Sequence, residues 1–261
     1  MIFEIIILFS AGILGGVINA IAGGGSFITF PALLLIGVNP ISANATNTLA
    51  SCAGYISGTF AFRKEISKYK NELTKLILVS FLGAILGAWL LLQISEAQFH
   101  YAIPWLLLFA TILFIFGSQI NEFIKKTMPK HRHVSLLGQA LLIIMLLAVA
   151  TYGGFFNAGL GFIALSYFAL SGYKDINAMN GLKLLISSIV SLVAVIIFIF
   201  NDLLAWYEGT VMLIGSMFGG YIASHYSKML PQKMIRMFVI VLSCGITLYF
   251  FVDLYGDSLS L

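Results

Sequence analysis

A glycine-rich stretch, Gly23-Gly24-Gly25-Ser26, interrupts a charge-free run that extends from Ile5 to Phe62. Glycine breaks a helix, and a helix that restarts after the break points free backbone N–H groups and the positive end of its dipole at one place. Such an end binds anions. We therefore expect Gly23, Gly24, Gly25 and Ser26 to bind a small anion. The alternative is a tight break that serves only close helix packing.

The pattern around this stretch returns in the second part of the chain. Gly15-Gly16-x-x-Asn19-Ala20 is repeated as Gly153-Gly154-x-x-Asn157-Ala158, and the glycine break returns in reduced form as Gly159-Leu160-Gly161. Asn44-Ala45-Thr46-Asn47 aligns with Asn180-Gly181-Leu182-Lys183. We expect Gly159 and Gly161 to be the weaker counterpart of the first break.

Uncharged polar residues lie at corresponding positions of the two parts. Such groups suit an oxyanion that must be bound and then released, because strong positive charge would trap it. Hydrogen bonding between helices, worth about 1 kcal/mol for each group, is the alternative. The candidates are Asn19, Thr46, Asn47, Asn157 and Asn180.

Lys183 lies about a third of the way along an apolar segment, Ile176–Asn201, that has no acidic residue near it. An unpaired ammonium inside a membrane is costly, so such a residue usually faces a cavity or a partner. We predict that Lys183 neutralises a bound anion. The alternative is a lysine near the cytoplasmic end whose amine extends to the membrane surface.

Composition places the chain in a membrane, since 60% of its 261 residues are hydrophobic and 9% are charged, against roughly 25% charged in soluble domains. The net charge of +4 comes from short basic loops and does not indicate nucleic-acid binding. We predict ten helical segments, of which Ser26–Val38 and Leu160–Ser171 are too short to cross a bilayer as straight helices. The others are Ile2–Ala22, Ile41–Phe62, Leu73–Gln93, Phe99–Ile120, Ser135–Phe156, Ile176–Asn201, Leu204–Tyr226 and Lys233–Asp253.

The fold predicted is an all-α polytopic membrane protein with two repeats of about five segments. The first repeat is 1–122, a basic cytoplasmic linker is 123–134, and the second repeat is 135–261. The basic loop that begins at Arg63 places its end of the molecule inside. If both halves follow this rule, the repeats are inverted and both termini lie outside. Eight spans with two re-entrant loops would make the repeats parallel, so whether 26–38 and 160–171 span or re-enter stays open.

Taken in order, these motifs resemble the TauE/SafE sulfite exporter family, also called the TSUP permeases. The resemblance rests on the GG-x-x-N-A opening, the Gly-Gly-Gly break that leads into a helix with Pro31, and Ala43-x-Ala45-Thr46-Asn47. It implies transport, without ATP hydrolysis, of sulfite, thiosulfate, sulfonates or similar small anions. The shorter second glycine run departs from the family pattern and favours one dominant site with unequal contributions from the halves.

We therefore expect a secondary transporter that works by alternating access between repeats, with an anion-selective pore as the alternative. No zinc-binding, Ser/His or paired-carboxylate motif is present, so we predict no enzyme, no metal and no cofactor. The expected partners are a small anionic substrate and the lipid bilayer, without nucleic acid, and a homo-oligomer stays open. The expected location is a bacterial cytoplasmic (inner) membrane.

Overall fold

The computed structural model describes residues 2–21, 23–127, 136–226 and 232–259, and it is helical throughout these ranges apart from short connections. The first half contains α1 (Ile2–Ile21), α2 (Ser26–Leu35), α3 (Pro40–Ala61), the short α4 (Arg63–Ile66) with a 3-10 turn at Ser67–Tyr69, α5 (Lys70–Leu92) and α6 (Glu96–Thr127). The second half contains α7 (Leu136–Phe155), α8 (Leu160–Leu170), α9 (Ile176–Phe200), α10 (Trp206–Tyr226) and α11 (Gln232–Leu259).

Every predicted apolar segment is a helix, and most helix ends fall within a few residues of the predicted bounds. The prediction was too short for α6, which continues to Thr127. Residues 123–127 of the expected linker are therefore helical, and 128–134 lie outside the described residues. The expected all-α fold is confirmed.

Six helical stretches in the described part of the chain are long and apolar enough to cross a membrane. The helices α3 and α10 are long enough to cross a membrane but are not among these six. Polar residues explain the exclusion of α3, because they lower its mean hydropathy. These residues are Asn44, Thr46, Asn47, Thr48 and Ser51, and all of them are buried. The six stretches are Ile2–Ile21, Arg63–Leu92, Glu96–Phe116, Leu136–Phe155, Ile176–Phe200 and Met237–Tyr255.

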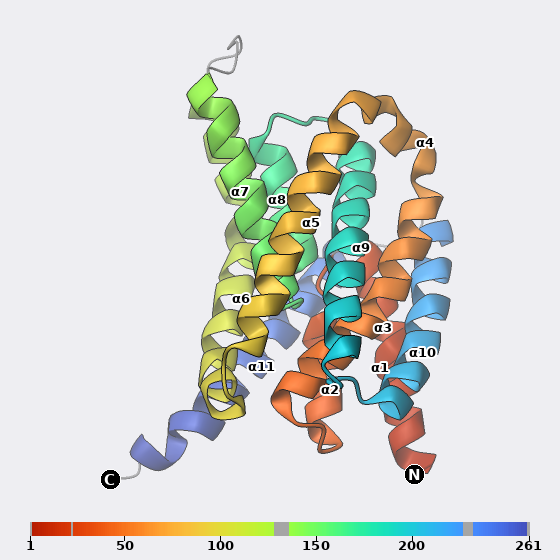
Figure 1. The fold of residues 1–261 in the computed structure, drawn as a ribbon, viewed down its shortest axis with the longest axis vertical. Coiled ribbons are helices and arrows are strands. Elements are labelled where there is room, and N and C mark those ends of the chain that lie inside the picture. Colours follow the sequence, from red (N-terminus) through yellow and green to blue (C-terminus); the bar gives the residue numbers. More distant parts are fainter. Residues whose placement is uncertain (1, 22, 128–135, 227–231, 260–261) are drawn as a thin grey trace.

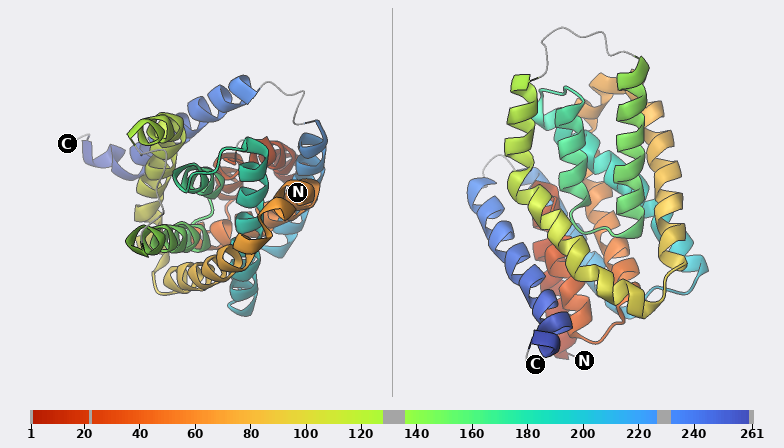
Figure 2. Two further views of the ribbon diagram at one scale, coloured as in Figure 1. Left: turned by 90° about the horizontal axis from the view of Figure 1, so that it is seen from above. Right: turned by 90° about the vertical axis from the view of Figure 1, so that its left-hand side faces the viewer.

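Both short helices fold back along the helix before them. Figure 1 shows that α2 runs from the interior to the end of the molecule where both termini lie, and that α8 runs to the opposite end, where α4 also lies. The views in Figure 2 agree with these directions. Contact between Gly15 of α1 and Thr29 of α2 documents the first of the two hairpins. Each hairpin thus turns inside the protein.

Glycines allow the hairpin helices to pack closely on helices of the other half. On α1, Gly12 and Gly16 lie against the backbone of α10 at Met212 and Ser216. On α5, Gly87 lies against the backbone of α7 at Thr151. Close approach through small residues is the usual basis of helix association in membranes. In the centre, α3 packs on α9, with the Thr59 and Ser188 hydroxyls 3.0 Å apart.

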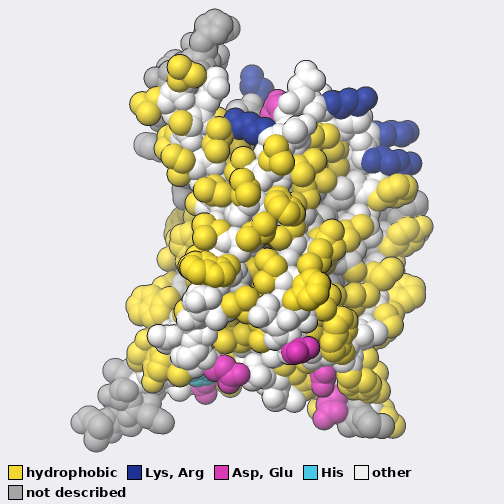
Figure 3. Space-filling view, viewed as in Figure 1, with side chains coloured by type: hydrophobic (Ala, Val, Ile, Leu, Met, Phe, Trp, Pro, Cys, Tyr) yellow, Lys and Arg dark blue, Asp and Glu magenta, His cyan; other side chains and the backbone are white. Residues whose placement is uncertain are grey.

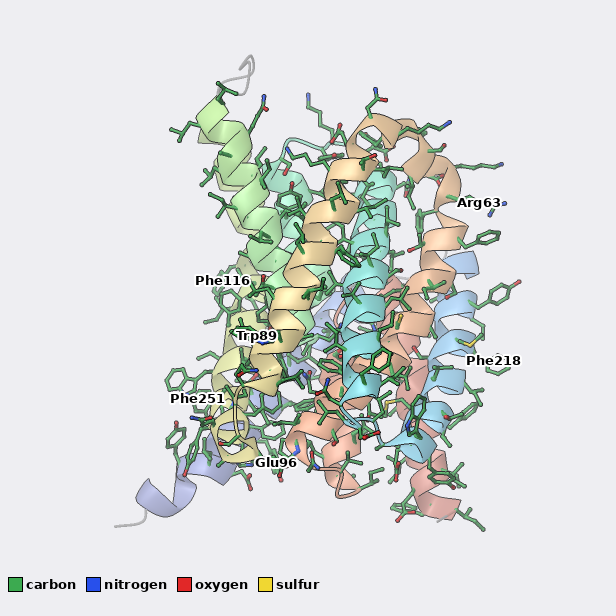
Figure 4. All side chains as sticks on the ribbon, viewed as in Figure 1. Arg63, Trp89, Glu96, Phe116, Phe218 and Phe251 are labelled. Carbon is green, nitrogen blue, oxygen red and sulfur yellow. The ribbon has the colours of Figure 1, made fainter. Side chains whose placement is uncertain are left out.

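Charged and apolar side chains are segregated on the surface. In Figure 3, Lys and Arg gather at the α4 end, whereas most visible Asp and Glu lie at the opposite end. Arg63 and Glu96 mark these two ends in Figure 4. Between them, Phe116 and Phe218 point outward from opposite sides and are 47% and 57% exposed. Such a girdle of exposed apolar side chains is what lipid contact requires.

Candidate functional site

The two hairpin turns meet inside the molecule through their glycines. A Cβ on Gly161 would lie 2.7 Å from Gly23 Cα, so the two backbones are in direct contact and neither position has room for a side chain. Gly23 and Gly159 have φ angles of +86° and +81°, which only glycine adopts readily. Each break therefore contains one left-handed glycine, and the breaks touch each other.

Neither helix that starts at these breaks has a side-chain cap. The N-cap residues of α2 and α8 are Gly25 and Gly159, and neither supplies a capping hydrogen bond. By contrast, Asn39 caps α3 and Asp175 caps α9 at the two ends of the molecule. The dipole of each helix still gives this end partial positive charge, although several of the first amides are hydrogen-bonded locally. Two such ends converge at the contact between Gly23 and Gly161.

Asn19 fixes the first break to the first half of the chain. Its Oδ1 accepts a hydrogen bond from the Gly25 amide at 2.7 Å, and its Nδ2 donates to Ser51 Oγ at 3.4 Å. The Gly25 amide is therefore already bonded. Gly25 itself is confined, since a Cβ there would lie 2.7 Å from Asn19 Cγ and would clash with the Gly15 carbonyl oxygen.

Asn157, at the second break, connects the two halves. Its Oδ1 accepts from the Tyr55 hydroxyl of α3 at 3.1 Å, and its Nδ2 donates to Ser191 Oγ of α9 at 2.9 Å. The Ser26 hydroxyl lies beside that of Tyr55 but has no hydrogen-bond partner among the described residues. All of these side chains are buried. We call this set the central cluster: Asn19, Ser26, Ser51, Tyr55, Asn157 and Ser191, with the touching glycines Gly23 and Gly161.

A second polar group lies beside the central cluster, toward the end of the molecule that carries the termini. Thr29 donates to Asn47 Oδ1, and Asn44 Nδ2 donates to the Phe155 carbonyl oxygen at 2.9 Å. Asn44 Oδ1 and Asn47 Nδ2 are buried without partners in the described part of the chain. These two atoms could therefore still form hydrogen bonds with a ligand. Leaving such a buried atom without a partner costs about 1 to 3 kcal/mol of folding free energy.

Other predicted site residues face elsewhere. The Thr46 hydroxyl accepts from the backbone N–H of Ala205, in the connection before α10, so it secures that loop. Gly24 lies against the side chains of Val239 and Phe162. Among the described residues, neither is hydrogen-bonded to the central cluster, and their role in anion binding stays a prediction.

Lys183 is buried, at 1% exposure, but it is distant from Asn47. On α9, Gly181 lies against Phe62 and Ile66, which places Lys183 near the last turns of α3. At about 1.5 Å per residue, roughly 20 Å separate the levels of Asn47 and Lys183. The Lys183 amine donates to Asn180 Oδ1 at 3.3 Å. Such burial is inconsistent with an amine that extends to the membrane surface.

The buried charge of the protein is entirely positive as far as the structure describes it. Lys183 is the one charged side chain among the buried residues described, and no buried Asp or Glu accompanies it. Two uncapped helix ends add positive potential at the central cluster. Within the described residues, no group of three or more His, Cys, Asp or Glu side chains could hold a metal ion.

Sequence reasoning missed Asn44, Ser51, Tyr55 and Ser191. Helical spacing could have found three of them, because Asn47, Ser51 and Tyr55 follow one another at intervals of four on α3. Lys183, Ser187 and Ser191 have the same spacing on α9. Residues four apart share one helix face, so each series predicts a polar stripe. Asn44 could have been found from its alignment with Asn180.

Comparison with known proteins identifies the family of the chain. A family model described as "Sulfite exporter TauE/SafE" matches residues 8–250. The chain belongs to the sulfite exporter TauE/SafE family. A family of exporters consists of membrane transporters, so membership indicates a membrane transporter and not an enzyme.

Three relatives cover almost the whole chain. "Probable membrane transporter protein YfcA" of Escherichia coli (strain K12) is 30% identical over 97% of this chain and 91% of its own length. "Probable membrane transporter protein" of Haemophilus influenzae is 30% identical over 92% of both chains. "Probable membrane transporter protein ORF9" of Sinorhizobium sp is 29% identical over 94% of this chain and 92% of its own length. No solved structure matches the chain.

Proposed function

We propose that the protein is a secondary transporter for small anions, such as sulfite, thiosulfate or sulfonates, and that the central cluster binds them. The observation that carries this proposal is the meeting of two uncapped helix N-termini at the contact between Gly23 and Gly161. Backbone dipoles that point at one place attract negative charge. The absence of a buried carboxylate among the described residues supports the same selectivity.

The central cluster suits a ligand that must leave as well as enter. Asn, Ser and Tyr side chains offer hydrogen bonds without full charge, so they can hold an oxyanion without trapping it. Ser26 Oγ is buried and free of partners among the described residues, and it is the hydroxyl that the sequence predicted as an anion ligand. Because the Gly25 amide already binds Asn19 and the Tyr55 hydroxyl already donates to Asn157, we assign the donor role mainly to Ser26.

We further propose that residues 1–122 and 135–261 are inverted repeats. Several paired features support this, because each pair has nearly the same offset along the chain. The left-handed glycines Gly37 and Gly172 end the two short helices, and the caps Asn39 and Asp175 begin the helices after them. The packing of α1 on α10 matches that of α7 on α5. Opposite directions of the two hairpins in Figure 1 agree with inversion.

In this proposal the α4 end faces the cytoplasm of a bacterial cell and both termini face outward. The gathering of Lys and Arg at the α4 end supports that orientation. The two repeats then expose the central cluster to each side in turn, as in other transporters built from inverted repeats. A membrane potential that is negative inside would favour export of an anion without any coupling ion.

Flux measurements with purified protein in liposomes test this function. We expect uptake of radiolabelled sulfite to saturate with concentration and to accelerate when unlabelled sulfite is present on the opposite side. Very fast flux without saturation would instead identify a pore. Liposomes that show no flux with sulfite, thiosulfate or small sulfonates would contradict anion transport.

A further inference from the structure

We propose that Lys183, Asn180 and Ser187 form a second anion-binding station, separate from the central cluster and located toward the α4 end. This station rests on the proposed function, because it lies on the route that an anion would take between the cluster and that end. The ligand class is the same, a small oxyanion that carries at least one full negative charge.

The state of Lys183 is the first observation that carries this inference. Its side chain is 1% exposed, and its one hydrogen-bond partner among the described residues is the neutral Asn180 Oδ1 at 3.3 Å. A buried ammonium without a negative partner is strongly destabilising. A transported anion would supply the missing charge, so the position makes physical sense in a protein that handles anions.

Two acidic groups at the same end of the molecule, Asp175 and Glu72, have other partners. Asp175 accepts from the amides of Asn177 and Ala178 at the start of α9, and it also pairs with Lys68 at 3.7 Å. Glu72 of α5 accepts from the Tyr173 hydroxyl. No described carboxylate is paired with Lys183, whose partner is the neutral Asn180.

Ser187 is the second, independent observation. It lies one turn after Lys183 on the same face of α9, is fully buried, and has no hydrogen-bond partner for its hydroxyl among the described residues. A cation and an unpartnered hydroxyl on one helix face form a built site for an oxyanion. Ser191, one further turn along, belongs to the central cluster through Asn157, so this stripe leads toward the cluster.

The spacing of this station repeats a group in the first half. Asn180, Lys183 and Ser187 have the same intervals on α9 as Asn44, Asn47 and Ser51 on α3. Both groups contain buried polar atoms without partners in the described part of the chain. The two differ in charge, since Asn47 takes the position that Lys183 has in the second half. An anion therefore meets a full positive charge on one side of the centre and an amide on the other.

Side-resolved affinity in liposomes tests the station. Orientation of the inserted protein is determined from the protease accessibility of the α4 loop, and sulfite is applied from one side at a time. We expect Lys183→Asn to raise the half-saturating sulfite concentration about tenfold at the α4 side and less than twofold at the other side. Asn47→Ala is the matched control, and its larger effect should fall on the opposite side.

Ser187→Ala keeps the test valid if Lys183→Asn does not fold, and it should raise the half-saturating concentration about threefold at the α4 side. Equal increases on both sides for either variant would show one shared site and overturn the second station, as would no increase on either side. Failure of the wild-type protein to transport sulfite would contradict the proposed function instead. The station would then be tested by thermal unfolding in detergent with and without sulfite. We expect sulfite to stabilise the wild type and Asn47→Ala and to stabilise Lys183→Asn less; equal stabilisation of all three would contradict the station.

Discussion

Asn19 and Asn157 occupy corresponding places in the two hairpins but bind different parts of the molecule. Asn19 binds Gly25 and Ser51, both in its own half, whereas Asn157 binds Tyr55 of the first half and Ser191 of the second. The first break is therefore fixed within its half, and the second break is a junction between halves. We infer that relative movement of the halves must change the hydrogen bonds of Asn157 before those of Asn19.

Substitution of Gly25 tests how tightly the first break is fixed. A Cβ in Gly25→Ala would clash with the Gly15 carbonyl oxygen and the Asn19 side chain, so we expect a loss of about 3 kcal/mol or more in the free energy of unfolding. Thermal unfolding in detergent measures this. Gly24→Ala is the matched control, because its Cβ would meet the ends of the Val239 and Phe162 side chains, which can shift. Equal melting temperatures for the two variants would contradict a rigid first break.

If the halves are inverted repeats, substitutions in the contact between α1 and α10 and in the contact between α5 and α7 should have similar effects on stability. A Cβ in Gly16→Ala would clash with the Ser216 carbonyl oxygen on α10, and one in Gly87→Ala would clash with the Thr151 carbonyl oxygen on α7. We expect each variant to lose about 2 kcal/mol in the free energy of unfolding. Gly245→Ala, which has no heavy atom within 4 Å of the added Cβ, serves as the control in the same melting series. A large loss of stability at only one of these two helix contacts would contradict their equivalence.

A negative charge at the second break tests the anion selectivity of the junction. Asn157→Asp keeps the size of the side chain and the acceptor for Tyr55, but it places a carboxylate where two helix N-termini converge. We expect sulfite flux in liposomes to fall at least about tenfold, because a fixed like charge opposes anion entry. The exposed Asn71→Asp on α5 should leave flux unchanged. Undiminished flux in Asn157→Asp would remove the central cluster from the transport route.

Much of the fold followed from the sequence because its signals are local. Charge-free segments, glycine breaks and caps lie within a few residues of the structures that they determine, so the bounds of α1, α3 and α9 were nearly correct. The contact between Gly23 and Gly161 also agrees with the expectation that both breaks share one site. Function at that site was inferred from residue types and stays a prediction.

The positions of Thr46 and Lys183 could not be derived in the same way. Each depends on how two helices distant in sequence align, and apolar sequences fix that alignment weakly. Ala205, the partner of Thr46, precedes α10, and the level of Lys183 follows from the packing of Gly181 on Phe62 and Ile66. Spacing could have placed Tyr55 on the polar face of α3, but only the structure shows that Asn157 of the other half lies opposite it.

The smallest change addresses the hydrogen bond from Tyr55 of α3 to Asn157 at the second break. Tyr55→Phe removes the hydroxyl that donates to Asn157 Oδ1 and keeps the buried ring, so we expect a loss of about 1 kcal/mol in the free energy of unfolding. If this bond restrains the junction, its loss should also raise the rate of sulfite exchange in liposomes, since movement of the halves then breaks one bond fewer. Thr59→Val, which removes the bond between Thr59 and Ser188 away from the breaks, separates a local effect from a general loosening of α3 on α9. A faster exchange in both variants would assign the restraint to the whole interface between α3 and α9, and a faster exchange in Tyr55→Phe alone would assign it to Asn157.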